Sequence, residues 1–296
     1  MRPSARARRA APVDLDPQLR RALEEDRVAE DRTSQAVVPP GARLRARIVA
    51  QAAGVVSGVA VAERLARRVG LTVRQRARDG SSVRSGRVVL ELEGNARRIL
   101  GVERTILNYL MHLSGVASET RRAVRAAKGR VRVLATRKTT PGLRDLEKAA
   151  VVHGGGAPNR RDLSDALLVK STHVRLVGLR AAVERALAAA PRGVPLEVEV
   201  RSPAEAVRAA DLGARALLLD NMSPSRIRAT VRAIRARTAR PRVRLEASGG
   251  IRPDNVARYA GLGLDEVSLG GLTHSAPALP FHLVVVDPSR RRRPAR

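Results

Sequence analysis

The chain has 296 residues, of which 44% are hydrophobic, so it can form a globular core, although only three aromatic residues contribute to it. It has no cysteine, which excludes disulfides, thiolate zinc sites and cysteine nucleophiles. The net charge of +29 favours polyanions, but arginines are spread along the chain and aromatics for base stacking are scarce, so we expect nonspecific rather than specific nucleic-acid binding.

The sequence contains no pattern typical of a membrane protein or a secreted protein. No apolar run approaches the roughly 20 residues needed to cross a bilayer. The basic N-terminus is not followed by the apolar segment of a secretory signal. We therefore expect a cytoplasmic protein with no membrane partner, whose basic ends, residues 1–10 and 289–296, are solvated tails.

The first part of the chain has the pattern of a small α+β unit. Apolar residues at helical spacing predict helices over residues 15–26, 59–69 and 95–113. Alternating or apolar segments predict strands over residues 44–49, 73–77 and 88–92. Turns at residues 39–41 and 79–80, rich in proline or glycine, separate these elements.

From about residue 131 the chain alternates between strand and helix patterns. Short apolar runs predict strands over residues 131–134, 166–169, 196–200, 216–219, 243–247 and 266–269. One intervening helix has a capping box from Ser202 to Glu205, with Pro203 in its first turn and Gly213 at its end. Such alternation is typical of parallel strands covered by helices, so we predict an α/β fold.

A charged residue or a glycine stands at the end of each of these strands. In chain order they are Arg137 with Lys138, Lys170, Glu199, Asp220, Ser248 to Gly250, and Gly270 with Gly271. The active site of an α/β barrel lies at the carboxyl ends of its strands, and late strands often carry glycine loops that bind phosphate. We therefore expect an active site at this rim.

The stretch from Thr136 to Arg144 places two adjacent cations, Arg137 and Lys138, just after the first of these strands. Only four of the 57 residues of Lys and Arg are lysines, so composition alone would rarely place a lysine here. Arginine binds a planar carboxylate through two parallel hydrogen bonds, whereas lysine is a compact charge suited to phosphate. The pair predicts a substrate that carries both groups.

Two glycine loops follow the late strands. Ser248 to Gly250 and Gly270 with Gly271 would let backbone N–H groups face a phosphate with no β-carbon in the way. Each loop alone is also compatible with an ordinary turn between a strand and a helix. Their shared position after late strands favours phosphate binding.

Two carboxylates, Glu199 and Asp220, end apolar strands and are suited to Mg²⁺ or to sugar hydroxyls. Glu197 lies two residues before Glu199 and should share its face of the strand, so either glutamate could be the functional one. A structural ion pair with one of the many arginines is the alternative for both strand ends.

The remaining candidates follow the triple glycine, Gly154 to Gly156, which allows close backbone approach and precedes Asn159 and Arg160. His173 is a candidate for orienting a substrate or for acid–base work, with a structural role as the alternative. We assign His112 and His274 to packing or to the surface. Because HExxH, paired-histidine and Walker motifs are lacking, zinc catalysis and ATP hydrolysis are disfavoured.

Taken together, these segments resemble the quinolinate phosphoribosyltransferase family over nearly the whole chain. The matching strings are Glu103 to Thr105 with Leu113 to Gly115, Thr136 to Leu143, Gly154 to Gly156, Glu197 to Val200, Leu219 to Ser223, Glu246 to Ile251, and Leu272 to Ser275. Shorter matches in the N-terminal part are Glu25 with Asp26, Gly54, Gly58, Asp79 with Gly80, and Glu93 with Gly94.

The resemblance implies a carboxylating nicotinate-nucleotide diphosphorylase, a pentosyltransferase of NAD biosynthesis. Such an enzyme transfers phosphoribose from phosphoribosyl pyrophosphate to quinolinate and yields nicotinate mononucleotide, CO₂ and pyrophosphate. The implied fold is an α+β sandwich domain over residues 11–115, an incomplete α/β barrel over 116–275, and a C-terminal segment, 276–288, that packs back on the first domain. The implied assembly is a homodimer, with a higher oligomer left open, in which Arg104 reaches the neighbour's site.

The resemblance also implies roles for the residues at the rim. Arg104, Arg137, Arg160 and Lys170 would surround the dicarboxylate, Lys138 would face phosphates, Glu199 and Asp220 would serve Mg²⁺ and the ribose hydroxyls, and Ser248, Gly249, Gly250, Gly270 and Gly271 would hold the 5′-phosphate. Lys138, Lys170, Glu199 and Asp220 are the catalytic candidates, and Asn159 and His173 are further substrate-binding candidates. Mg²⁺ is expected to accompany phosphoribosyl pyrophosphate, and no organic cofactor is needed.

Three motifs near the expected site depart from the family pattern. The usual Asn-His-Arg is Pro158-Asn159-Arg160, so a neutral amide replaces a histidine. The usual Lys-Asp-Asn-His is Lys170-Ser171-Thr172-His173, and the usual Gly-x-Gly-Asp is Val28-Ala29-Glu30-Asp31. Asn159 can donate and accept hydrogen bonds but cannot carry charge. A paralogous phosphoribosyltransferase that uses another aromatic or heterocyclic acid outside NAD synthesis is therefore the alternative function.

Overall fold

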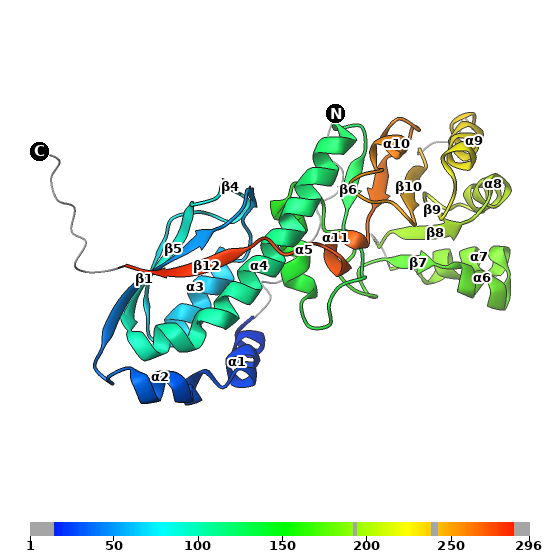
Figure 1. Ribbon diagram of the computed structural model, residues 1–296. Coiled ribbons are helices and arrows are strands. Elements are labelled where there is room, and N and C mark those ends of the chain that lie inside the picture. Colours follow the sequence, from blue (N-terminus) through cyan, green and yellow to red (C-terminus); the bar gives the residue numbers. More distant parts are fainter. Residues whose placement is uncertain (1–14, 192–193, 238–241, 287–296) are drawn as a thin grey trace, which may run out of the picture.

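The computed structural model describes residues 15–191, 194–237 and 242–286, and the predicted basic tails at 1–10 and 289–296 lie outside them. Within the described residues there are a four-stranded sheet, a six-stranded sheet and a two-stranded ribbon. Figure 1 shows the four-stranded sheet at one end of the molecule and the six-stranded sheet at the other, with helix α4 (Ala96–Ala127) running between them.

The N-terminal sheet is antiparallel. Its strand order is β12 (Phe281–Val285), β1 (Arg43–Ala50), β5 (Val88–Asn95) and β3 (Thr72–Gln75). Alternation buries one face: Ala46 and Ile48 are fully covered, whereas Arg45 and Arg47 on the other face pair with glutamates of β5. The three strands predicted in this region therefore exist, with shifted ends.

Strand β12 was not predicted from the sequence. It pairs antiparallel with β1, from Ala46 opposite Val285 to Ala50 opposite Phe281. The C-terminal end of the described chain thus returns to the N-terminal sheet, as the red strand in Figure 1 shows.

Short elements complete the N-terminal unit. They are α1 (Asp16–Glu25), the 3₁₀ turn η1 (Val28–Glu30), α2 (Arg32–Val37), α3 (Val59–Arg68) and the ribbon of β2 (Gly54–Val55) with β4 (Ser82–Val83). The helices predicted at 15–26 and 59–69 correspond to α1 and α3. The prediction did not include α2, whose first turn is capped by the Asp31 side chain.

Helix α4 has 32 residues and extends well beyond the predicted end at residue 113. It continues through Ser114 and Gly115, both buried, because the C-terminal segment crosses there: a β-carbon on Gly115 would lie 2.2 Å from the Pro277 carbonyl oxygen. Glycine is required for this close approach. The predicted boundary between residues 115 and 116 therefore falls inside a helix.

The C-terminal sheet is parallel throughout. Its strand order is β6 (Arg132–Leu134), β11 (Glu266–Ser268), β10 (Arg244–Ser248), β9 (Ala216–Asp220), β8 (Leu196–Val200) and β7 (Leu167–Val169). All six strands predicted from residue 131 onwards are present. Because β6 and β7 are the two edges, the sheet is open, and the predicted α/β fold with an incomplete barrel is confirmed.

Helices connect these strands. They are α5 (Arg144–His153), α6 (Ser171–Val177), α7 (Leu179–Ala189), α8 (Pro203–Asp211), α9 (Pro224–Arg235), α10 (Ala257–Ala260) and α11 (Gly271–His274). Half of the capping box predicted for α8 is present: Ser202 Oγ accepts from the Glu205 N–H at 3.1 Å, whereas the Glu205 carboxylate accepts from the Arg201 N–H at 2.8 Å and not from that of Ser202. No described helix has the length and hydropathy needed to span a bilayer.

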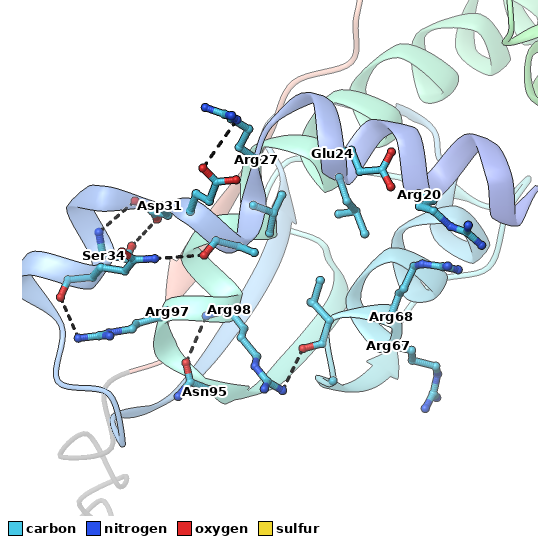
Figure 2. A pocket seen from close by; sticks show the side chains of 17 residues that line it. Arg20, Glu24, Arg27, Asp31, Ser34, Arg67, Arg68, Asn95, Arg97 and Arg98 are labelled. Carbon is cyan, nitrogen blue, oxygen red and sulfur yellow. Dashed lines mark hydrogen bonds and ion pairs between the residues drawn. The ribbon is translucent and has the colours of Figure 1, made fainter.

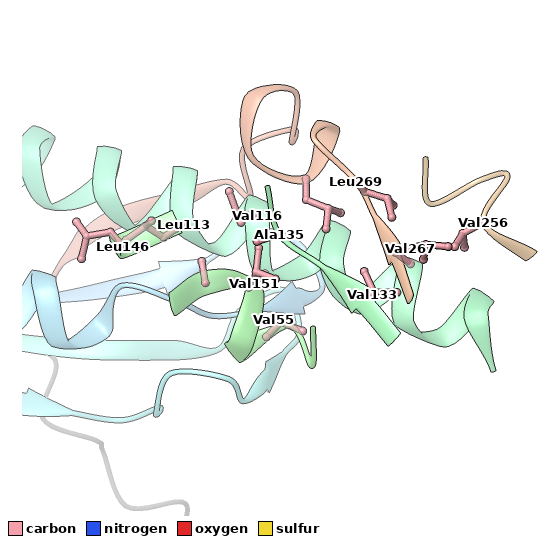
Figure 3. Packing of buried hydrophobic residues seen from close by; sticks show 14 of the residues in the cluster. Val55, Leu113, Val116, Val133, Ala135, Leu146, Val151, Val256, Val267 and Leu269 are labelled. Atoms are coloured by element: carbon pink, nitrogen blue, oxygen red, sulfur yellow. The ribbon is translucent and has the colours of Figure 1, made fainter. Parts of the chain in front are cut away.

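Aliphatic residues join the two units. Leu113 and Val116 of α4 pack near Leu146 and Val151 of α5, and Figure 3 shows this cluster beside β6 and β11. All four side chains are buried. Burying each such side chain contributes about 1.5–3 kcal/mol, so many moderate contributions replace the missing aromatics.

Candidate active site

The predicted rim residues gather at one edge of the C-terminal sheet. Hydrogen bonds join adjacent strand ends: Ser171 N–H donates to Glu199 Oε1 at 3.1 Å, and Asn221 N–H donates to the Ser248 carbonyl at 2.9 Å. Near β6, on the same side of the sheet, Thr273 Oγ1 donates to the Lys138 carbonyl at 2.7 Å. Parallel strands bring their carboxyl ends together, which is why residues far apart in sequence meet here.

The loop of residues 136–143, which carries Arg137 and Lys138, is held by its own polar groups and by α5. Lys138 N–H donates to Thr136 Oγ1 at 3.0 Å, and Thr140 N–H donates to Glu147 Oε2 at 3.0 Å. The buried Glu147 was not singled out by sequence reasoning, because its role depends on a contact with the loop that precedes its helix.

Arg137 and Arg160 lie close enough to affect one another. Desolvation and the nearby charge of Arg137 lower the pKa of Arg160, while Glu197 and Glu246 act in the opposite direction. The Arg137 Nε atom is buried and has no hydrogen-bond partner among the described residues. Two neighbouring, partly buried guanidinium groups with donors to spare suit an anionic ligand.

Lys148 adds a buried amine below the rim. Its Nζ donates to the Pro158 carbonyl, next to Asn159. Desolvation, followed by the charges of Arg144, Arg160 and Arg137, lowers the pKa of Lys148 to about 8, with Asp165 opposing. Sequence reasoning assigned Lys148 no role, although the scarcity of lysine in this arginine-rich chain was an available signal.

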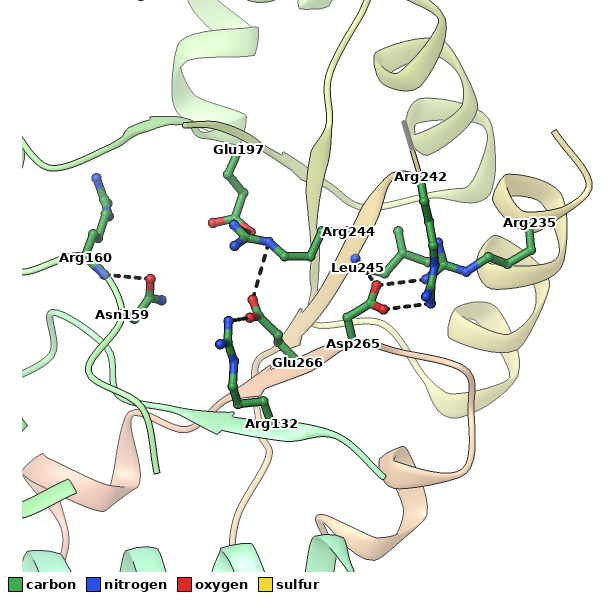
Figure 4. Close-up of polar contacts among 10 residues, drawn as sticks. All are labelled: Arg132, Asn159, Arg160, Glu197, Arg235, Arg242, Arg244, Leu245, Asp265 and Glu266. Atoms are coloured by element: carbon green, nitrogen blue, oxygen red, sulfur yellow. Dashed lines mark hydrogen bonds and ion pairs between the residues drawn. The ribbon is translucent and has the colours of Figure 1, made fainter. Parts of the chain in front are cut away.

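Asn159 stabilises its own loop. Its φ of 51° is in the left-handed region, where asparagine is enriched, and its Oδ1 accepts from the Arg160 N–H at 2.7 Å. Figure 4 shows this contact beside the Arg160 side chain. The amide that replaces the family's histidine therefore has a local structural partner.

Glu199 and Asp220 share an arginine. Arg201 Nη2 lies 4.0 Å from Glu199 Oε1 and 3.4 Å from Asp220 Oδ2. The ion pair that the sequence left as an alternative is therefore present. Arg201 itself, directly after β8, was not among the predicted site residues.

Glu197 shares the strand face of Glu199, as predicted from the period of two, but it lies deeper in the barrel. It faces Arg244, whose Nη2 is 4.0 Å from Glu197 Oε1, and Arg244 also pairs with Glu266 (Figure 4). Burial and the charge of Glu197 raise the pKa of the nearby Glu246 to about 8. A layer of buried acids thus lies beneath the rim cations.

The two glycine loops differ in backbone geometry, since Gly249 and Gly250 have positive φ whereas Gly270 has a helical φ of −64°. Gly249 has a φ of +97°, and a β-carbon there would lie 2.2 Å from Asn221 Oδ1. A β-carbon on Gly270 would lie 2.9 Å from Lys138 Cδ and 3.1 Å from His274 Nε2. His274 is exposed, in agreement with its assignment to the surface, but it also lies at the rim beside Lys138.

His173 and Arg104 are placed differently from the rim cluster. His173 Nδ1 accepts from the Lys170 N–H at 2.9 Å and so caps α6, which corresponds to the structural alternative. Arg104 lies on α4 and lines a cavity of about 590 Å³ together with His112, Thr140 and residues of α1. This cavity also contains Pro141 and Leu143, so Arg104 lies on the α4 side of the loop that carries Arg137 and Lys138.

Another cavity, of about 1010 Å³, lies in the N-terminal unit, where Figure 2 shows it between α1, α2 and the ends of α3 and α4. Two of its arginines bind backbone carbonyls: Arg97 Nε donates to the Val38 carbonyl at 2.7 Å, and Arg98 Nη1 donates to the Val69 carbonyl at 3.3 Å. None of the predicted site residues lines it. The rim is therefore the better candidate site.

Comparisons with known proteins agree with this geometry. Residues 31–114 match the family described as quinolinate phosphoribosyl transferase, N-terminal domain, and residues 116–284 match its C-terminal domain. The chain is 44% identical over 260 residues to a probable nicotinate-nucleotide pyrophosphorylase [carboxylating] of Methanothermobacter thermautotrophicus, which covers 86% of this chain and 93% of that protein.

Two further relatives extend these matches. A nicotinate-nucleotide pyrophosphorylase [carboxylating] of Mycobacterium leprae is 40% identical, over 90% of this chain and 95% of that protein. The crystal structure of NadC from Streptococcus pyogenes superposes with a TM-score of 0.85 and 38% identity, covering 94% of this chain and all of the other.

Proposed function

This chain belongs to the quinolinate phosphoribosyltransferase family, and we propose that its rim is the site of the family's reaction. The protein is a carboxylating nicotinate-nucleotide pyrophosphorylase of NAD biosynthesis. It transfers phosphoribose from phosphoribosyl pyrophosphate to quinolinate and forms nicotinate mononucleotide, CO₂ and pyrophosphate. The observation that carries the assignment to the rim is the convergence of cations, carboxylates and glycine loops at one sheet edge.

We assign the dicarboxylate to the cations at the β6 and β7 ends of the rim. Arg137 and Arg160 can each form paired hydrogen bonds with a planar carboxylate, and Lys170 adds a compact charge. The unpartnered Arg137 Nε supports this assignment, because a buried donor requires an acceptor. Asn159 fixes the loop that presents Arg160.

We assign the phosphates and the ribose to the other strand ends. Lys138 would contact phosphate oxygens, and the backbone of Ser248 to Gly250, with Gly270 and Gly271, would hold the 5′-phosphate. Glu199 and Asp220 would accept hydrogen bonds from the ribose hydroxyls. His173 would act indirectly, by holding the start of α6 next to Lys170.

The carboxylates also fit an Mg²⁺ ion that arrives with phosphoribosyl pyrophosphate. Both lie within 4.0 Å of one Arg201 nitrogen, so they can approach a shared cation. The described residues contain no group of three or more acidic, histidine or cysteine ligands. Mg²⁺ often binds through one or two carboxylates and keeps water and phosphate ligands, so Glu199 and Asp220 suffice. When bound, the ion would neutralise charge on the departing pyrophosphate.

The chain's own residues then act by placement and by charge. The ring nitrogen forms a bond to the ribose anomeric carbon as the bond from that carbon to pyrophosphate breaks, and Lys138 would stabilise the departing oxygens. The nitrogen becomes cationic. It therefore stabilises the electron pair left on the ring when the 2-carboxylate departs as CO₂, and that carbon takes up a proton.

We further propose that the enzyme works as a homodimer in which Arg104 contributes to the partner's site. Arg104 is exposed and lies on α4, where it lines a cavity together with Thr140 of the loop that carries Arg137 and Lys138. An exposed arginine on a long helix can enter a neighbouring site across a twofold interface.

The reaction is tested by incubating the purified protein with Mg²⁺, phosphoribosyl pyrophosphate and quinolinate labelled in the 2-carboxylate. We expect labelled CO₂ and nicotinate mononucleotide in equal amounts, and neither product when phosphoribosyl pyrophosphate is omitted. Lack of CO₂ release with quinolinate, together with turnover of another heterocyclic acid, would indicate the paralogous function instead.

A further inference from the structure

The loop of residues 136–143, which carries Arg137 and Lys138, is tied at Thr140 to a carboxylate that lies outside the rim. The Thr140 N–H donates to Glu147 Oε2 at 3.0 Å. The other oxygen, Glu147 Oε1, lies 2.7 Å from Nε2 of His112, a residue of α4. One carboxylate therefore links a helix that runs through the N-terminal unit to the loop of the active site.

Glu147 is fully buried, so its two contacts are not incidental. A buried carboxylate is costly unless donors satisfy it, and here each oxygen has one. Glu147 also lies in the first turn of α5, where the helix dipole favours negative charge. If either donor is removed, the carboxylate loses part of its stabilisation and is free to rotate away from the other.

The position of Thr140 gives this link its importance. It lies two residues after Lys138. Within the loop and its immediate neighbour, Lys138 N–H donates to Thr136 and Arg144 donates to Thr139. At Lys138 the loop is also held from α11, because Thr273 Oγ1 donates to the Lys138 carbonyl at 2.7 Å. The bond to Glu147 anchors the loop to α5, as the Thr273 bond anchors it to α11. Small displacements of a substrate-binding group have large effects on rate, so the anchor bears on catalysis.

We propose that His112 and Glu147 are positioning residues, which hold the backbone at Thr140 and thereby place Arg137 and Lys138 against the substrates. This role rests on the proposed function of the rim. His112 acts through Glu147 and touches no substrate. The assignment of His112 to mere packing or surface is thereby replaced by a defined task.

The test compares His112→Ala, which removes the donor, with His112→Gln, which retains an N–H donor near the position of Nε2. We expect His112→Ala to lower kcat/KM by about 10- to 100-fold, because the loop is displaced while the reacting groups remain. His112→Gln should retain most of the activity. Glu147→Gln keeps the shape of the side chain but turns an N–H toward one of the two donors, His112 or Thr140. Its kcat/KM should fall as in His112→Ala, and it replaces that variant in the test if His112→Ala does not fold.

A second measurement is independent of turnover. Hydrogen exchange of the peptide that contains Thr140 should become faster in His112→Ala and stay at the wild-type rate in His112→Gln. The matched control is His153→Ala. His153 ends the same helix α5, and its Nδ1 lies 2.8 Å from Ser57 Oγ, so it also joins the two units but does not contact the loop.

We expect His153→Ala to reduce the melting temperature without changing the exchange rate at Thr140 or kcat/KM. If His112→Ala behaves like this control, the link is only structural and the proposal is wrong. If the wild-type protein does not convert quinolinate, the proposed function is contradicted instead. The exchange rates at Thr140 would still report whether His112 holds the loop.

Discussion

Arg201 binds both carboxylates at the ends of β8 and β9: its Nη2 lies 3.4 Å from Asp220 Oδ2 and 4.0 Å from Glu199 Oε1. The Arg201 carbonyl in turn accepts from Arg226 Nη2 at 2.7 Å, which fixes the backbone there. The arginine therefore neutralises the two groups to which we assign Mg²⁺ and the ribose. Any cation that binds them competes with this guanidinium.

Replacing Arg201 by glutamine should lower the Mg²⁺ concentration needed for half-maximal rate, because the competing charge is removed. The measurement is the initial rate against free Mg²⁺ at saturating substrates. Arg180→Gln, which removes an exposed arginine paired with Glu184 on α7, is the control. An unchanged Mg²⁺ requirement would mean that Arg201 and the ion do not share these carboxylates.

Asn159→Ala should raise the KM for quinolinate more than Asn159→Gly does. Both variants lose the bond to the Arg160 N–H, but alanine also disfavours the left-handed backbone by about 1–2 kcal/mol, whereas glycine adopts it freely. The KM for phosphoribosyl pyrophosphate should stay constant in both. Equal effects on quinolinate would show that the loop backbone is not what Asn159 contributes.

Gly249→Ala should abolish most of the activity through loss of phosphoribosyl pyrophosphate binding. The new β-carbon would collide with the Asn221 side chain and backbone, and φ there is +97°. Gly86→Ala controls for the backbone effect alone, since φ is +82° with no atom within 4 Å and no site nearby. The measurement is the affinity for phosphoribosyl pyrophosphate, obtained by titration. A near-normal affinity of Gly249→Ala would mean that this loop does not bind the phosphate.

Glu246 should make stability depend on pH. Its folded pKa of about 8 exceeds the ordinary value of 4.5, so the native state holds an extra proton between these values and loses stability as pH rises through that window. Facing it are Glu197 of β8, Glu266 and Ser268 of β11, and Arg244 of its own strand. Lys148, whose folded pKa of about 8 lies below the ordinary 10.5, affects stability only above that window.

Glu246→Gln removes this proton uptake. The melting temperature of the wild type, relative to the variant, should therefore fall between about pH 5 and pH 8. The control is Glu184→Gln, at an exposed position on α7, whose melting temperature should depend on pH as that of the wild type does. A constant difference between wild type and Glu246→Gln across this range would show that Glu246 is ionised throughout.

Mixing two inactive variants tests the placement of Arg104 in the partner's site. Arg104→Ala and Lys138→Ala should each be inactive, but a mixed dimer has one site with both residues intact. Random exchange of subunits should therefore restore about a quarter of wild-type activity. No recovery after verified subunit exchange would mean that Arg104 serves its own chain or none.

The sequence predicted the strands of the parallel sheet and the residues that end them, because buried strands are short apolar runs and their ends carry polar side chains or glycine. Parallel pairing alone then brings Arg137, Lys170, Glu199 and Asp220 to one edge. The family resemblance was also contained in these strings, and the matches to both domains of the family confirm it.

Contacts between distant segments decided the rest. Strand β12 exists because the edge of β1 is available to it, and α4 continues past Leu113 because Gly115 admits the crossing chain at Pro277. The roles of Glu147 and Arg201 likewise depend on contacts with other segments, which a local sequence pattern cannot predict. Local propensity and periodicity fix which residues bury and which end a strand, but only packing determines which donor meets a given carboxylate.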